Sequence, residues 1–149
     1  MSQFKNLLAG LTGAIALNIL HETVRKTSAN APRIDLLGEE ALQKTLNHAG
    51  MNISDKKDLY EATLTGDILS NAFYFSMIGA GKEKSSLLSK AAIAGFTAGI
   101  GALTLPKPLG LNPKPVTRNT QVKAMTVGYY VFGAMVTGLV LKLLYKNSN

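Results

Sequence analysis

The sequence contains no cysteine and no tryptophan, and its only histidines are His21 and His48. Without cysteine the chain can form no disulfide, no thiolate nucleophile, and no cysteine-ligated metal or iron–sulfur centre. A zinc site would need carboxylates beside the histidines to complete its coordination. We therefore expect no bound metal and no other cofactor.

The sequence also lacks the common catalytic motifs. It has neither of the glycine-rich loops that cradle phosphates, GxxxxGK[ST] and GxGxxG, nor the GxSxG turn of serine hydrolases. His21 and Glu22 are adjacent, but the second histidine of the zinc-protease helix motif is missing. An enzyme is therefore the least supported class of function, and the sequence indicates no catalytic residue.

Basic residues outnumber acidic ones, 16 to 9, which gives a formal charge of +7. They are scattered through the polar connections and form no clustered stripe with interleaved aromatic residues, so we expect no nucleic-acid partner. A chain of 149 residues is expected to form one domain.

In place of catalytic motifs the sequence has long uncharged runs. The clearest runs from Ala124 to Leu141, 18 residues without a charge, which reaches the length typical of a membrane-spanning helix. Lys123 precedes it, and Tyr145 follows at a position suited to the headgroup region. The alternative is a buried helix of a soluble all-helical protein.

Three further segments are consistent with the membrane interpretation. We predict an all-α integral membrane bundle, with residues 1–149 forming one membrane domain in the cytoplasmic (inner) membrane of a bacterium. The predicted transmembrane helices lie near residues 4–24, 58–80, 86–105 and 121–145.

Two connections have a distinctive composition. Residues 35–49 have apolar positions on one stripe and predict a short amphipathic helix, with Asp35 as its N-cap, that packs on the bundle or on a partner. Residues 106–118 contain four of the five prolines, so we expect an extended or turn-like connection without helix.

Polar residues inside the predicted spans are the candidate functional residues. His21, Glu22 and Arg25 lie near the end of the first span, and Asp67 and Asn71 share a face of the second. They could form a proton relay or a structural ion pair, with Arg25 as a partner for Asp67. We expect Asp67 to face the bundle interior, because a carboxylate facing lipid is costly.

Small residues at spacings of three to five predict close helix packing in lipid. The positions are Gly10, Gly13, Gly95, Gly99, Gly128 and Gly138.

Three functions remain open at this point. The first is a small polytopic membrane protein that acts through helix packing, as a homo-oligomer or as an accessory subunit of a membrane complex, with lipid and other membrane subunits as partners. The alternative is a small transporter or channel with a polar intramembrane path, and the third is a membrane-embedded enzyme. Polar side chains that converge on a cavity would favour the second over the first.

Overall fold

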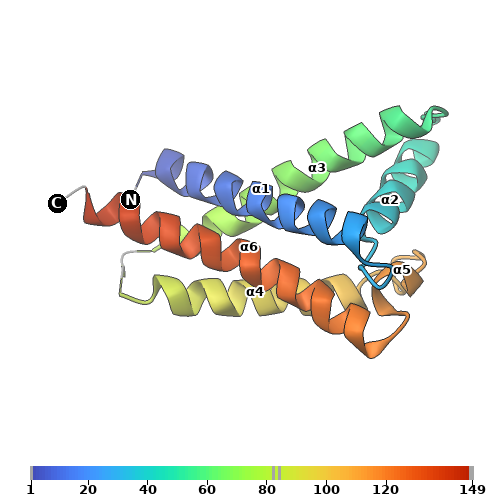
Figure 1. The fold of residues 1–149 in the computed structure, drawn as a ribbon. Coiled ribbons are helices and arrows are strands. Elements are labelled where there is room, and N and C mark those ends of the chain that lie inside the picture. The colour runs from blue at the N-terminus through green and yellow to red at the C-terminus, as the bar shows by residue number, and fades with distance from the viewer. Residues whose placement is uncertain (1, 82, 84, 148–149) are drawn as a thin grey trace.

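The computed structural model describes residues 2–81, 83 and 85–147, and the regular structure in this part of the chain is helical throughout. Figure 1 shows the helices in chain order. They are α1 (Gln3–Thr27), α2 (Ile34–His48), α3 (Lys56–Ser76), the 3₁₀ turn η1 (Met77–Gly79), α4 (Leu87–Thr104), α5 (Lys114–Thr117) and α6 (Thr120–Lys146).

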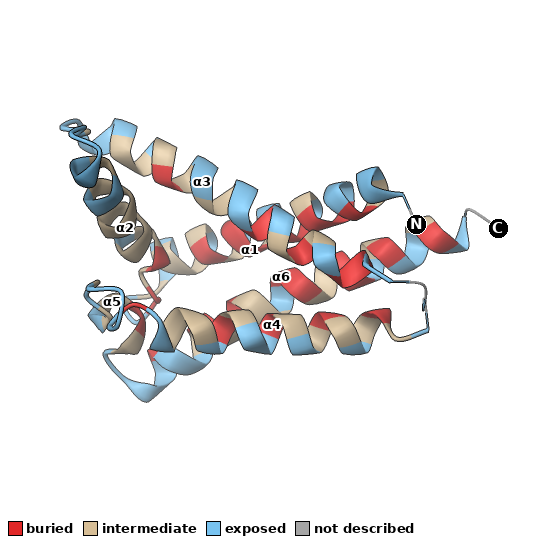
Figure 2. Cartoon of the chain, turned by 180° about the vertical axis from the view of Figure 1, so that it is seen from behind, coloured by how far each residue is buried: buried red, intermediate tan, exposed pale blue. Residues whose placement is uncertain are grey.

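The long helices form an arrangement centred on α6. Helix α6 packs against both α1 and α4, and it runs antiparallel to them (Figure 1). Helix α3 packs mainly against α1. It comes close to α4 near η1 and diverges from it toward α2, which lies across the wide end (Figures 1 and 2). The core lies between α1, α3, α4 and α6, and Leu17 and Phe75 are fully buried there.

Side-chain caps determine where two of the helices begin. The Asp55 carboxylate accepts a hydrogen bond from the backbone N–H of Asp58 at the start of α3, 2.9 Å away. Asn119 caps α6 in the same way through the N–H of Val122 at 2.8 Å. The predicted cap at Asp35 is wrong: α2 begins one residue earlier, after Arg33, and the Asp35 carboxylate binds the Arg33 guanidinium instead.

The proline-rich connection contains a short helix that we did not expect. Helix α5 starts at Lys114 and has Pro115 in its first turn. Proline is compatible with that position, because the first N–H groups of a helix have no intrahelical acceptor. The prediction of a connection without helix is therefore wrong for these four residues. The preceding turn includes Gly110, whose φ of 76° favours glycine.

Three helices in the described part of the chain are long and apolar enough to cross a membrane, namely α1, α4 and α6. This is consistent with a membrane location. Helix α3 has 21 residues but is not one of them. Its polar residues, among them Glu61, Asp67 and Asn71, lower its mean hydropathy.

Two glycines of α4 allow that helix to approach α6 closely. A Cβ atom at Gly95 would lie 2.6 Å from the Cα of Val131, and one at Gly99 would lie 2.7 Å from the Cα of Val127. Carbon atoms in contact are normally about 3.5–4.0 Å apart, so a side chain at either position would force the helices apart.

The other predicted packing glycines divide into two groups. A Cβ at Gly10 would collide with the backbone of α3, and one at Gly13 would collide with the backbone of α6. A Cβ at Gly138 would lie 2.8 Å from the Cβ of Ala91 on α4. Gly128 is different, because a Cβ there would meet no atom within 4 Å. Among the described residues no other helix therefore packs closely against Gly128, and its predicted packing role stays a prediction.

Candidate functional site

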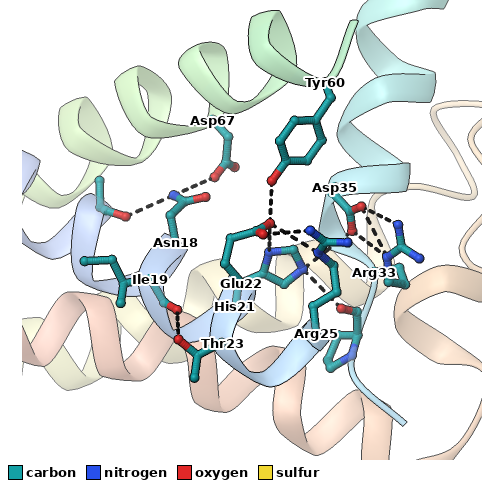
Figure 3. Close-up of polar contacts among 12 residues, drawn as sticks. Asn18, Ile19, His21, Glu22, Thr23, Arg25, Arg33, Asp35, Tyr60 and Asp67 are labelled. Carbon is teal, nitrogen blue, oxygen red and sulfur yellow. Dashed lines mark hydrogen bonds and ion pairs between the residues drawn. The ribbon is translucent and has the colours of Figure 1, made fainter. Parts of the chain in front are cut away.

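The first polar cluster lies at the C-terminal end of α1, where His21 is only 4% exposed. Its Nε2 donates a hydrogen bond to the carbonyl oxygen of Pro32 at 3.2 Å and lies 3.5 Å from an Asp35 oxygen. Its Nδ1 lies 3.8 Å from a Glu22 oxygen. His21 therefore joins the end of α1 to the start of α2 (Figure 3).

Two side chains, Arg25 and Tyr60, donate hydrogen bonds to the Glu22 carboxylate. Arg25 donates to it from Nε at 3.2 Å and from Nη2 at 2.7 Å, and the Tyr60 hydroxyl of α3 donates to the same carboxylate (Figure 3). The predicted pairing of Arg25 with Asp67 is wrong. Arg25 lies about 10 Å farther along α1 than Asn18, which is the residue opposite Asp67. Glu22, one turn away, is the nearer anion.

Asp67 of α3 faces α1 and is held by two amides. Asn18 donates to Oδ2 and Asn71 donates to Oδ1, each at 3.0 Å. In the described part of the chain Asp67 makes no salt bridge. A carboxylate can accept about four hydrogen bonds, so two neutral donors leave part of its acceptor capacity unused.

The Asp35 carboxylate is only 7% exposed and is paired with Arg33, whose Nη2 lies 2.6 Å from it. Burial alone would raise the pKa of Asp35. The hydrogen bonds and positive charge of Arg33, with the nearby His21 and Arg25, outweigh burial and hold this pKa below its ordinary value. The sequence pattern indicated Asp35 only as a cap, so its role beside His21 was missed.

These polar groups line one cavity of about 490 Å³ between α3 and α4. Its floor comes from α1 and α6, and α2 with residues 106–111 closes the wide end. Most of the lining is apolar, including leucines and alanines of α2, α3 and α4. Four of the five predicted polar residues line the cavity, and Arg25 does not. The four are His21, Glu22, Asp67 and Asn71.

Three tyrosines also line the cavity, although none was among the candidate functional residues predicted from the sequence. Tyr60 and Tyr74 lie seven residues to either side of Asp67 and therefore share its face of α3. Tyr130 reaches the cavity from α6. The seven-residue spacing was visible in the sequence, but the contribution of Tyr130 depends on how α6 packs. Ser70, three residues after Asp67, is exposed, and its hydroxyl donates a hydrogen bond to the backbone carbonyl oxygen of Asp67.

The chemistry available at this site is binding through hydrogen bonds, charge and apolar contact. Within the described residues no group of three or more histidine, aspartate or glutamate side chains is placed to hold a metal ion. The His21 imidazole is engaged by Pro32 and Asp35.

Comparison with known protein families, with curated proteins and with solved structures finds no match to this chain. The class is therefore defined by the structure itself. It is a helical protein with three apolar helices that could span a membrane and with a mostly apolar cavity that these helices line together with α2 and α3.

Proposed function

We propose that this chain is an integral membrane protein with four spans, α1, α3, α4 and α6, that binds an apolar or amphiphilic molecule from the bilayer in the cavity between α3 and α4. The exposed large apolar side chains support membrane insertion. They occur on all four helices, where lipid would cover them. Examples are Ile19 on α1, Phe73 on α3, Ile93 on α4 and Leu143 on α6, each more than half exposed.

Helix α3 is the least apolar of the four, and two features support its inclusion. Leu69 and Phe73 near its C-terminal end, and Met77 at the start of η1, are exposed at spacings of four residues. Its 21 residues extend over roughly 31 Å, about the thickness of the hydrocarbon core. The charged side chains in its first turns would lie in the headgroup region. Asp67, deeper in the span, faces the cavity and avoids lipid.

The observation that carries the proposal is the convergence of polar side chains from α1 and α3 on one cavity. Residues that only mark the bilayer edge would be scattered. Pockets that are mostly apolar with a few convergent polar groups are typical of ligand sites. A small transporter would use the same cavity, and flux of the bound molecule across vesicles would distinguish transport from binding alone.

The packing function, as a homo-oligomer or an accessory subunit, has weaker support. The prediction of a packing function was based on six glycines expected to line helix contacts. Five of these six pack against helices of the same chain. They therefore offer no surface to a second subunit. Gly128 is the exception, and one open glycine is little basis for an interface.

Binding of a neutral apolar fluorophore, N-phenyl-1-naphthylamine, to purified protein in nanodiscs tests the proposal. Ala98 of α4 lines the cavity, so the ring introduced by Ala98→Phe should obstruct it and remove saturable binding. Ile93→Phe is the control, because Ile93 is 67% exposed on the same helix. The proposal predicts saturable binding by wild type and Ile93→Phe only. Equal fluorescence from all three proteins and from protein-free nanodiscs would contradict it.

A further inference from the structure

The cavity wall has an uneven distribution of charge. Three carboxylates line it, those of Glu22, Asp35 and Asp67. Glu22 is paired with Arg25 at 2.7 Å and Asp35 with Arg33 at 2.6 Å. Asp67, in contrast, has only the amides of two asparagines as donors in the described part of the chain.

The consequence is one negative charge on the wall, that of Asp67, which is paired with neither Arg25 nor Arg33. A charge in a low-dielectric setting is costly unless a counter-charge or several hydrogen bonds compensate it. The two asparagine amides supply some of the hydrogen bonds that Asp67 can accept, but no side chain in the described part of the chain supplies a counter-charge. A bound ligand is in a position to supply it, because Asp67 itself lines the cavity.

The aromatic lining is suited to the same kind of ligand. Tyr60 and Tyr74 flank Asp67 on α3, and Tyr130 comes from α6. The hydroxyl of Tyr60 is bound to Glu22 and that of Tyr74 to the carbonyl oxygen of Ala94 at 3.0 Å, so hydrogen bonds fix both rings. Aromatic ring faces attract cations electrostatically, most strongly where water is excluded.

From these two features we infer that the ligand is a hydrophobic monovalent cation, an apolar body with one ammonium or similar positive group held near Asp67. This inference rests on the proposed function, since it names the class of molecule that the cavity takes. The apolar side chains of α2 and α4 contact the body, and the carboxylate with its tyrosines contacts the charge. An anion of the same shape is disfavoured, because its charge would oppose that of Asp67.

Tetraphenylphosphonium and tetraphenylborate provide the test, because they carry four phenyl groups around one atom and differ in the sign of charge. Binding of each is measured by equilibrium dialysis against protein in detergent, with Ala98→Phe as the background. We expect tetraphenylphosphonium to bind at least roughly tenfold more tightly than tetraphenylborate. Asp67→Asn should weaken binding of the cation by roughly tenfold, about 1.4 kcal/mol, and should affect N-phenyl-1-naphthylamine much less, because that probe carries no charge.

Glu61→Gln is the matched control, because the Glu61 carboxylate lies on the same helix, is 62% exposed and is paired with Lys57. It should bind the cation as the wild type does. The inference would be overturned if the protein bound the two ions with equal affinity, or if Asp67→Asn bound the cation as tightly as the wild type does. The proposed function would still stand in that case, provided that the wild type binds the neutral probe N-phenyl-1-naphthylamine. Loss of saturable binding for all probes in the wild type would overturn both. If Asp67→Asn does not fold, the relative affinity of the wild type for the two ions still tests the inference.

Discussion

The contact between α4 and α6 gives a quantitative prediction for Gly99→Leu. A Cβ at this position would lie 2.7 Å from the Val127 Cα and 3.1 Å from its Cγ1. Restoring an ordinary carbon contact of about 3.7 Å requires the helices to separate locally by about 1 Å, before the rest of the leucine side chain is placed. Overpacking of this kind typically costs about 1–3 kcal/mol. Lipid offers no hydrophobic driving force to offset it.

The assay is thermal unfolding of the purified protein in detergent, with Gly128→Leu as the control. Gly128 lies on α6 next to Val127, and a Cβ there meets no atom within 4 Å. Both changes replace glycine by leucine in a helix, so they share the gain in helix propensity. Gly99→Leu should melt several degrees lower than Gly128→Leu, since 1 kcal/mol corresponds to about 2–4 °C. Equal melting temperatures would refute the packing of α4 on α6 described above.

Two further predictions concern polar contacts. The lowered pKa of Asp35 means that its ionised form stabilises the fold above the unfolded-state pKa, and that this contribution is lost as the pH falls through the folded-state pKa. Asp35→Asn should therefore show a smaller drop in melting temperature between about pH 6 and pH 3 than the wild type. Tyr145→Phe should destabilise the protein by about 1–2 kcal/mol, because the hydroxyl donates to the buried Asn6 at 2.6 Å. Tyr129→Phe should cost less, since its buried hydroxyl finds no partner among the described residues, and similar losses of denaturation temperature for both variants would contradict this.

The helices were largely predictable because their signals are local. The uncharged run from Ala124 to Leu141 lies inside α6, and the amphipathic stripe placed α2 within one residue of its bounds. The error at Lys114–Thr117 has a local cause as well. Four prolines in residues 106–118 argued against helix, but one of them, Pro115, lies in the first turn of α5, where proline is tolerated.

The candidate site was less predictable, because it depends on tertiary contacts. Asp67 and Asn71 could be placed on one face from their spacing, but the partner of Asp67 could not. The positive charge of Arg25 made it the expected partner. The position at which α1 crosses α3 places Asn18, not Arg25, opposite Asp67. The cavity itself follows from the divergence of α3 from α4 (Figure 2), which no sequence pattern indicates.

The membrane passage of α3 decides whether the cavity lies within a four-span bundle. The chain has no cysteine, so a single introduced cysteine reports its own position. Ser54→Cys lies in the connection before α3, and Ser85→Cys lies in the connection after it, both exposed. In sealed vesicles of one orientation, a membrane-impermeant maleimide should label one variant directly and the other only after permeabilisation. Labelling of both from the same side would show that α3 does not cross the membrane.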